Sequence, residues 1–125
     1  MGEVRWELNS KKVDVYNEES YVDLEGVDLL IFTAADERLQ VIGDRGRYSQ
    51  DSRDVWVSGN VKVLYGNDYV LYSDTLHWDI DGQTMKADGA AKAEGPNGSI
   101  TGKGMTIDVR RHKIYIKKNV TAQLN

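Results

Sequence analysis

The fold prediction rests on the pattern in the segment Val55-Trp56-Val57-Ser58-Gly59-Asn60-Val61-Lys62-Val63. Its valines fall at every second position, which is typical of a strand with one buried face and one face in water. Gly59 interrupts this run without changing which positions are apolar. The glycine therefore predicts a bend or bulge inside one long strand.

The same pattern recurs along the chain at nearly constant intervals. Residues 41–63 align without gaps on 71–93 at an offset of 30, and 71–93 align on 100–122 at an offset of 29. A weaker fourth copy lies upstream at an offset of 33 and loses one residue after Gly26. Gly26, Gly59 and Gly89 share one column of the repeat, which Lys118 occupies in the last copy. Each copy predicts a long hairpin that buries its apolar face only against its neighbours.

The sequence predicts an all-β, antiparallel fold in a single domain over residues 1–125. No window shows the apolar spacing of a helix, and turn signals such as Asp81-Gly82 and Pro96-Asn97-Gly98 separate the apolar runs. Residues 33–40 are expected to form a loop. Stacked hairpins would give a folded or rolled sheet that is lined inside by apolar side chains. The repeat period by itself also allows a parallel β-solenoid.

Composition and charge exclude several classes of function. The 125 residues include 16 Lys and Arg against 20 Asp and Glu, and the resulting net charge of −4 argues against nucleic-acid binding. Without cysteine, the chain has no disulfide scaffold and no thiol chemistry. The longest apolar run, residues 29–32, is far too short to cross a membrane.

The charge is unevenly distributed along the chain. Residues 1–40 hold ten acids and four bases, whereas residues 101–125 hold six bases and one acid. Such an asymmetry can indicate a surface that meets a partner. A solvated face that happens to be basic is the alternative interpretation.

The sequence offers little catalytic or metal-binding chemistry. His77 is expected on the wet face and His112 in a basic turn, and neither has a ligand partner at the spacing of a zinc site. Residues 79–82 resemble the start of a calcium loop, but no glutamate follows at the required spacing, so a hairpin turn is favoured. No catalytic residue, metal or cofactor is predicted. Paired carboxylates from distant segments keep an enzyme as a remote alternative.

The inward face is where function could reside. Its side chains are small or medium, with three alanines on one hairpin and the adaptable Met85 and Met105. A face of this kind either packs into a closed core or leaves an apolar cleft that suits an acyl chain.

The order of these segments resembles the LptC family, the periplasmic component of the lipopolysaccharide export machine, within the OstA-like superfamily. The resemblance runs from Trp6 to about Leu124. It is carried by Trp6-Glu7-Leu8, Val13-Asp14-Val15-Tyr16, Val22-Asp23-Leu24-Glu25-Gly26-Val27, Gly43-Asp44-Arg45-Gly46-Arg47-Tyr48, Val57-Ser58-Gly59-Asn60-Val61, Leu71-Tyr72-Ser73-Asp74-Thr75-Leu76-His77-Trp78-Asp79 and Ile100-Thr101-Gly102-Lys103-Gly104-Met105. The sister bridge protein, LptA, shares the Gly-Asn-Val unit, but the opening Trp6-x-Leu8 is more similar to LptC.

The resemblance implies a β-jellyroll of the "β-taco" kind, V-shaped in section and open along one side. It implies that lipopolysaccharide lies with its acyl chains in the groove and its sugars outside. The lipid would pass from an inner-membrane transporter at the N-terminal edge to an LptA-type bridge protein at the C-terminal edge, by addition of edge strands. Whether two copies also pair as a homodimer is left open. A periplasmic location is implied, with an N-terminal transmembrane anchor in the full-length protein that these residues do not contain.

The parity of each position, meaning the face of the strand that alternation assigns to it, and the resemblance together predict which residues line the lipid groove. Each of these residues could instead belong to a closed hydrophobic core. They are Leu24, Val57, Val61, Trp78, Met85, Met105, Ile107, Ile116 and Leu124. A groove that is open to solvent would favour a lipid carrier. A completely closed one would favour a scaffold protein of the same fold that binds partners by its sheet edges alone.

The charge asymmetry leads to a further hypothesis about the basic turn. Arg110, Arg111 and Lys113 are expected to steer an acidic partner edge towards the C-terminal end of the domain. Contact with lipid phosphates is the alternative role for the same three side chains.

Overall fold

The structure is a computed structural model, and it describes residues 5–16, 20–32, 38–66, 68–111 and 113–124. These residues form strands and turns, and none of them forms a helix that could cross a membrane. The eight strands are β1 (Arg5–Tyr16), β2 (Tyr21–Phe32), β3 (Arg38–Ser49), β4 (Asp54–Tyr65), β5 (Tyr69–Asp79), β6 (Thr84–Gly95), β7 (Gly98–Asp108) and β8 (Lys113–Leu124).

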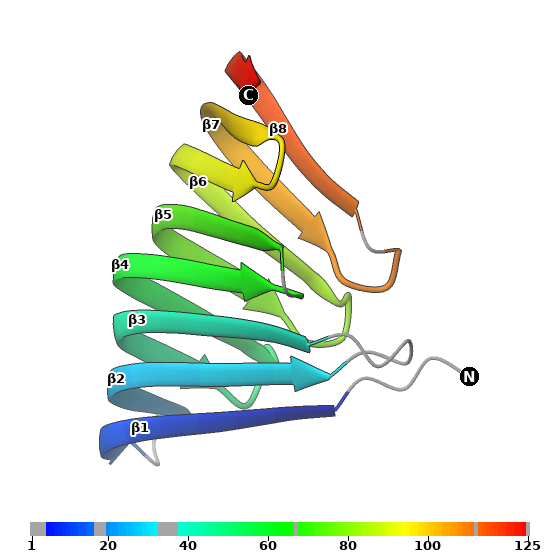
Figure 1. The fold of residues 1–125 in the computed structure, drawn as a ribbon. Coiled ribbons are helices and arrows are strands. Elements are labelled where there is room, and N and C mark those ends of the chain that lie inside the picture. The colour runs from blue at the N-terminus through cyan, green and yellow to red at the C-terminus, as the bar shows by residue number, and fades with distance from the viewer. Residues whose placement is uncertain (1–4, 17–19, 33–37, 67, 112, 125) are drawn as a thin grey trace.

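The strands form one antiparallel sheet in which spatial order follows sequence order from β1 to β8 (Figure 1). The predicted all-β antiparallel class is therefore confirmed, and the alternative of a parallel solenoid is wrong. The repeat offsets carry each hairpin onto the next, because β1 and β2 shifted by 33 coincide with β3 and β4. The expected loop at 33–40 is wrong at its end, since β3 begins at Arg38; residues 33–37 lie outside the described residues.

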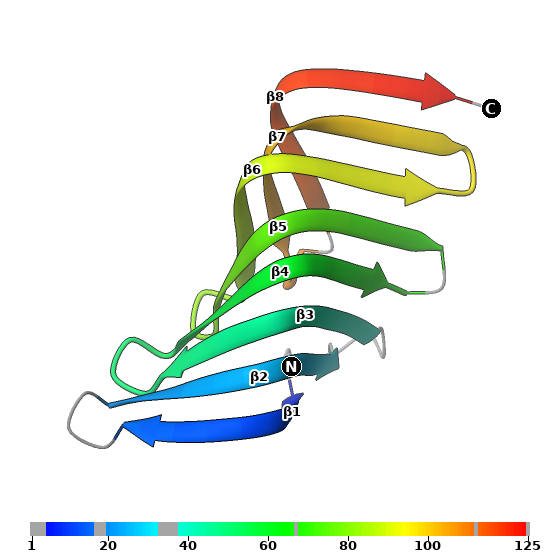
Figure 2. The same cartoon turned by 90° about the vertical axis from the view of Figure 1, so that its left-hand side faces the viewer.

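Each strand turns in its middle, so the sheet folds back on itself into two layers, as Figures 1 and 2 show. We call the two halves limb A and limb B. Limb A comprises residues 5–10, 27–32, 38–43, 61–65, 69–73, 91–95, 98–102 and 119–124, and limb B comprises 12–16, 21–25, 45–49, 54–58, 75–79, 84–88, 104–108 and 113–117. From the β3–β4 pair to the β7–β8 pair, the register shifts at this turn.

The bend of β4 shows how the sequence produces the turn. Gly59 and Asn60 both have left-handed backbone angles, with φ of 83° and 49°, and they insert one extra residue between two in-register stretches. Asn60 Nδ2 donates a hydrogen bond to Asp44 Oδ2 on β3 at 2.9 Å, which holds the bend from the neighbouring strand. Two consecutive left-handed residues turn the strand while keeping Val57 and Val61 on the same face. The prediction of a bend at Gly59 is confirmed.

Gly26 and Gly89 occupy the same repeat column as Gly59, but the backbone geometry of the bend differs at each of them. Gly26 has a left-handed φ of 70°, and β2 bends there without any shift of register against β1 or β3. Gly89 lies within a register shift, and no atom would lie within 4 Å of a Cβ built on it. In β8 the left-handed residue is Asn119, with φ of 53°, beside Lys118. Left-handed geometry at the bend is thus required at some copies of the repeat and not at others.

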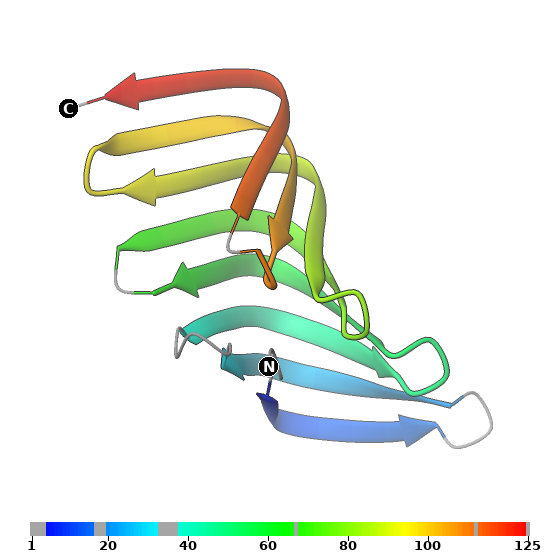
Figure 3. The same cartoon turned by 90° about the vertical axis from the view of Figure 1, so that its right-hand side faces the viewer.

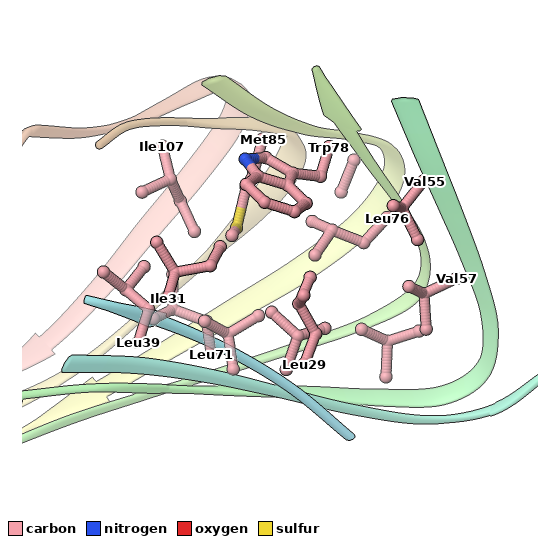
Figure 4. Packing of buried hydrophobic residues seen from close by; sticks show 14 of the residues in the cluster. Leu29, Ile31, Leu39, Val55, Val57, Leu71, Leu76, Trp78, Met85 and Ile107 are labelled. Carbon is pink, nitrogen blue, oxygen red and sulfur yellow. The ribbon is translucent and has the colours of Figure 1, made fainter. Parts of the chain in front are cut away.

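The core lies between the two limbs and consists of apolar side chains from β2 to β7 (Figure 4). The largest completely buried side chains are Trp78, Leu29, Ile31, Leu39, Leu71, Leu76, Met85, Met105, Ile107, Val41, Val55 and Val57. Deletion of one such side chain leaves a cavity and costs about 2–5 kcal/mol. Packing between the limbs is therefore what holds the bent sheet closed.

A small polar network fixes the outer surface of limb B. Asp54 accepts hydrogen bonds from Ser52 Oγ at 2.7 Å and from His77 Nε2 at 2.7 Å. The His77 ring in turn stacks on Trp56, with centroids 4.0 Å apart. Partial burial works to raise the pKa of Asp54, but the hydrogen bonds from Ser52 and His77 outweigh it and lower that pKa.

Gly59 and Gly89, two of the three glycines of the repeat column, should respond differently to a methyl group. Gly59→Ala places a Cβ at a left-handed φ of 83° and within 2.9 Å of the Cβ of Asp44, so we expect a loss of about 1–2 kcal/mol. Gly89→Ala meets nothing, and we expect a change within about 0.5 kcal/mol or a small gain. Urea unfolding of the two variants measures the difference. Equal effects would contradict the assignment of the bend.

Stability in acid should depend on Asp54. Because its folded-state pKa is lowered, its contribution is present above its unfolded pKa of about 3.9 and is lost as the pH falls through the folded-state value. Asp54→Asn should cost about 1 kcal/mol near pH 7 and flatten the loss of stability below pH 4. Unfolding midpoints between pH 7 and 2.5 test this, with Asp81→Asn, whose side chain is 67% exposed, as the control. An unaltered acid profile for Asp54→Asn would refute the role of the network.

Candidate functional site: the two open ends of the inner face

The inner face of limb A forms one continuous apolar row that crosses all eight strands. Cross-strand pairing places its members in the order Leu8, Leu29, Val41, Val63, Leu71, Ala93, Ile100 and Ala122. The middle members are completely buried, whereas Ile100 is 39% exposed and Ala122 is exposed. The row is therefore closed over β2 to β5 and open over β7 and β8.

Limb B carries a matching row whose exposure runs in the opposite direction. Its members, in strand order, are Val15, Val22, Tyr48, Val55, Trp78, Met85, Ile107 and Ile114. Val15 is 61% exposed at the β1 end, while Val55 to Ile107 are buried. Val13, its neighbour on β1, is also 51% exposed. The inner face of limb B is thus open at the N-terminal end of the sheet.

The two gradients arise because the limbs do not lie directly over each other. Trp6 on limb A of β1 packs edge-on against Trp78 on limb B of β5, with ring centroids 5.4 Å apart. It also contacts Tyr48 on limb B of β3, at 5.9 Å. A strand of limb A therefore covers limb B of strands that come later in the order. This offset leaves limb A uncovered at the C-terminal end, where Figures 2 and 3 show the limbs of β8 diverging.

The uncovered inner face of limb A is hollowed at its C-terminal end. An open hollow of about 140 Å³ lies at the tips of β5 to β8. It is lined by Tyr69, Ala93, Glu94, Gly95, Pro96, Asn97, Gly98, Ser99, Ile100 and Leu124. Beside it, Val120 and Leu124 are 52% and 80% exposed on the same face. We call this surface (Tyr69, Ala93, Ile100, Val120, Ala122 and Leu124) the open inner face.

The residues expected to line the groove fall into three places. Seven are buried in the filled core: Leu24, Val57, Val61, Trp78, Met85, Met105 and Ile107. Ile116 is half-buried at the margin of that core, and Leu124 lies on the open inner face. The structure thus brings eight of the nine together in or beside one cluster and leaves the ninth at the end that solvent reaches.

Sequence reasoning missed most of the open inner face. Ile100, Val120 and Ala122 have the inward parity of their strands, so alternation could have placed them inside. Parity does not tell which inward positions remain uncovered, because that depends on the offset between the limbs. Tyr69 also has the inward position of its strand, two residues before Leu71, but it directly follows a turn, where alternation is a weaker signal.

Among the core residues that the structure describes, one polar group is buried without a hydrogen-bond partner. The indole Nε1 of Trp78 makes no hydrogen bond, although the side chain is only 1% exposed. A buried donor without an acceptor costs about 1–3 kcal/mol. An ester or amide carbonyl that entered between the limbs would give this N–H an acceptor, which a pure hydrocarbon would not.

The basic residues singled out in the sequence lie at the far tip of limb B. Arg110 and Arg111 belong to the exposed β7–β8 turn, and Lys113 begins β8. The backbone N–H of Arg111 donates to Asp108 Oδ1 at 3.1 Å, and its guanidinium Nε lies 3.9 Å from Asp108 Oδ2. Lys113 is paired with Asp108 across the hairpin. The cluster therefore flanks the exposed edge of the sheet at the limb B tip.

The remaining polar candidates act in the fold. His77 lies on the outer face in the Asp54 network, while His112 falls outside the described residues. The Gly82 N–H donates to Asp79 Oδ1 at 3.2 Å, as in a hairpin turn, and Asp81 pairs with Arg53. Among the described residues, no group of three or more His, Asp or Glu side chains could hold a metal ion. The arrangement is suited to binding apolar chains and strand edges.

Comparison with solved structures identifies a close architectural relative. The chain superposes on LptH of Pseudomonas aeruginosa, the LptA-homologous periplasmic component of the lipopolysaccharide transport device, with a TM-score of 0.73. The alignment covers 98% of this chain and 95% of that one, at 11% sequence identity. At this identity the likeness shows the fold, which is the LptA-like β-jellyroll. No curated protein sequence matches the chain significantly.

A comparison with family models assigns the chain directly. The model described as "Lipopolysaccharide-assembly, LptC-related" matches residues 1–125, which is the entire chain. This match and the bent eight-stranded sheet agree with the resemblance carried by the sequence segments. The chain belongs to the LptC-related family of lipopolysaccharide-assembly proteins.

Proposed function

We propose that this chain carries lipopolysaccharide along its apolar inner face and passes it, end to end, between partners docked on its two sheet edges. The observation that carries this proposal is the open inner face at the C-terminal end, where apolar side chains of one limb lie in solvent. A periplasmic location follows from the same family membership. Transport of this kind needs no catalytic residue in the chain, since the energy is supplied elsewhere.

The open inner face suits acyl chains by its chemistry. Ile100, Val120 and Leu124 present aliphatic surface next to a shallow hollow of about 140 Å³. Each buried CH₂ group is worth about 0.8 kcal/mol, so a few methylene groups on this face already supply several kcal/mol. The surface holds the lipid weakly enough for release, because it covers only one side of a chain.

Passage through the middle of the domain requires the limbs to separate. The ladder between β5 and β6 is interrupted from Ser73 to His77 on one strand and from Lys86 to Ala91 on the other. Figure 2 shows the two ribbons diverging at that bend. Cross-strand pairing restrains the bend least there, so in our proposal the angle between the two limbs changes most easily at this seam. The unpartnered indole N–H of Trp78 would then gain an acceptor from an acyl ester.

The reversed exposure gradients support docking at both edges. β1 and β8 are the edge strands, and each has one unpaired side. A partner strand added to β8 would continue limb A, and the partner's own limb B would cover Val120, Ala122 and Leu124. At the other edge, the exposed Val13 and Val15 would be covered by limb A of a partner docked on β1. In our proposal the transporter occupies the β1 edge and the LptA-type bridge protein the β8 edge.

A scaffold protein is the second candidate, and a specific observation favours it. The core between β2 and β7 is filled, with its largest side chains less than 2% exposed. A domain of this kind could bind partners through its edges without admitting lipid. The two candidates differ in whether lipid touches the inner face.

Photo-crosslinking distinguishes the carrier from the scaffold. A photoreactive amino acid at Ile100 or Leu124 should form adducts with lipopolysaccharide in cells. The same group at Thr121, which lies between Val120 and Ala122 on the opposite face of β8, should form none. Adducts from Leu24 or Met105 would show in addition that the limbs part, because both side chains are buried.

The outcome against the carrier is equally clear. If the inner positions give no more adduct than Thr121 while the domain still co-purifies with its Lpt partners, lipid does not touch the inner face. The scaffold function would then replace the carrier function. Circular dichroism of each substituted domain shows that the fold is retained.

Steering by the basic tip makes a separate prediction about kinetics. Reversing Arg110, Arg111 and Lys113 to Glu should slow association with an LptA-type bridge protein about tenfold at low salt, with little change in dissociation. The difference should shrink at high salt, because exposed charges are screened. Stopped-flow binding across a salt series measures this.

A charge-matched control keeps the test specific. Reversing Arg38, Arg45 and Lys62, all exposed but far from the β7–β8 turn in the sequence, changes the net charge by the same amount. Equal slowing by both triple variants would mean that total charge, and not the basic tip, sets the rate. Loss of lipid crosslinking with normal partner association would instead assign the three residues to lipid phosphates.

A further inference from the structure

The outer surface of the C-terminal bend carries a hollow that the proposed lipid path does not use. It has a volume of about 300 Å³ and is formed by β6, β7 and β8. Its lining consists of Lys86, Ala87, Asp88, Lys103, Gly104, Met105, Thr106, Lys117 and Lys118. Four of these nine residues are lysines and one is an acid. We call this site the lysine hollow.

Gly104 creates the depression at the centre of the lysine hollow. A Cβ built on it would meet nothing nearer than the Lys117 Cβ, at 3.7 Å, so the space above its backbone is open. Its φ of 76° is left-handed, a conformation that glycine adopts without strain. The methylene stem of Lys117 lies beside the bare backbone, with its Cγ and Cδ also within 4.0 Å of the built atom. The bend thus exposes backbone at the centre of the hollow.

The charge around this depression is not balanced. Lys103 and Lys118 are direct cross-strand partners, an arrangement in which like charges destabilise a sheet. In the part of the chain that the structure describes, none of the four lysines forms an ion pair, and Asp88 forms none either. By contrast, Lys92 on the same strand as Lys86 is paired with Glu94 at 2.9 Å. The lysine hollow therefore retains about three uncompensated positive charges.

Protection of the sheet edge explains only part of this pattern. Lysines on an edge strand discourage unwanted strand pairing, and Lys117 and Lys118 lie on the edge strand β8. Lys86 and Lys103 lie on the interior strands β6 and β7, where no edge needs protection. Their convergence with the edge lysines on one hollow needs another reason.

The bulge of β6 reaches the same place, since Asp88 lines the hollow. Asp88 and Gly89 have no cross-strand partner in the described sheet, either on β5 or on β7. A Cβ built on Gly89 would meet no atom within 4 Å, so the backbone next to Asp88 is open as well. Lysine contributes a flexible point charge with three donors, which is the usual partner of a phosphate group.

We propose that the lysine hollow binds a phosphate group, carried either by a soluble phosphate or by a lipid headgroup. Lys103 and Lys118 bind the phosphate from the neighbouring strands β7 and β8, and Lys86 and Lys117 neutralise its remaining charge. The bare backbone at Gly104 leaves space for it. The site goes beyond the proposed transport function, because it lies on the outer face and uses none of the inner apolar residues apart from the edges of Ala87 and Met105. It accounts for the cost of placing four lysines together.

Pyrophosphate is the probe for the first experiment. Titration of the intact domain, followed by the amide signals of its two-dimensional NMR spectrum, should give saturable shifts centred on Gly104, Gly89 and Lys118. Lys103→Gln combined with Lys118→Gln should weaken binding about tenfold or more. Both side chains are exposed, so the double variant is expected to fold, and its thermal midpoint should equal or exceed that of the unchanged protein.

Two further variants separate a built site from general positive charge. Gly104→Asn fills the depression, tolerates the left-handed φ and leaves the charge unchanged, and it should also weaken binding. Lys12→Gln with Lys62→Gln removes two exposed lysines elsewhere and should change the affinity less than twofold. The proposal is overturned if this control weakens binding as much as the hollow variant does, or if the shifts spread evenly over all lysines.

Vesicles distinguish the two sources of the phosphate. Co-sedimentation with phosphatidylglycerol vesicles, absent with phosphatidylcholine vesicles and reversed by pyrophosphate, would assign the lysine hollow to an anionic lipid headgroup. Binding of pyrophosphate without co-sedimentation would assign it to a soluble phosphate. Because neither measurement involves the inner face, the lysine hollow and the transport function can fail independently.

Discussion

The structure depends on one geometric constraint: each strand must bend in its middle while both halves present their apolar side chains to the same interior. A straight strand with alternating side chains would form a flat sheet with an uncovered apolar face. The bend allows the sheet to cover that face with itself, so a chain of 125 residues builds a two-layered core from one meander. The extra residues, left-handed angles and register shifts at the bends are all means to this end. The geometry of the bend differs between hairpins, but in each of them the apolar side chains of both limbs still point to the interior.

Much of this constraint could be predicted from the sequence. Alternation indicated the strands, the repeat indicated their pairing into hairpins, and Gly59 indicated the bend. The residue missing after Gly26 corresponds to a strand that bends with no register shift, which only the structure shows. The expected end of the loop at 33–40 was wrong, because β3 already begins at Arg38. There the buried Leu39 alternates with Arg38 and Gln40, but three alternating residues after a polar segment are too few to predict a strand. Local sequence patterns were therefore sufficient to predict the strands and their order in the sheet.

The candidate site could be predicted only in part, for a physical reason. Parity states which side of a strand a residue occupies, and it placed Trp78, Met85 and Ile107 correctly inside. It does not state which strand lies across the interior, because that depends on the offset between the limbs. That offset arises from contacts such as Trp6 against Trp78, which are 72 positions apart in sequence. Leu71 and Ile100 share a row and a parity, yet one is buried and the other is open.

The two apolar rows are exposed at opposite ends of the sheet, and this also affects the local stability of each strand. The middle strands share a packed interior, whereas β8 contributes inner side chains of which several remain in water. Free energy of local opening should therefore rise from β8 towards the middle of the sheet, so that amide hydrogens of limb A in β8 exchange first. A protein docked on that edge would complete the interior and bind only the ordered form of β8, so its concentration would add to the stability of the domain by mass action. On its own, the domain therefore leaves its last strand less stable than the others, and a protein that covered Val120, Ala122 and Leu124 would raise the stability of that strand.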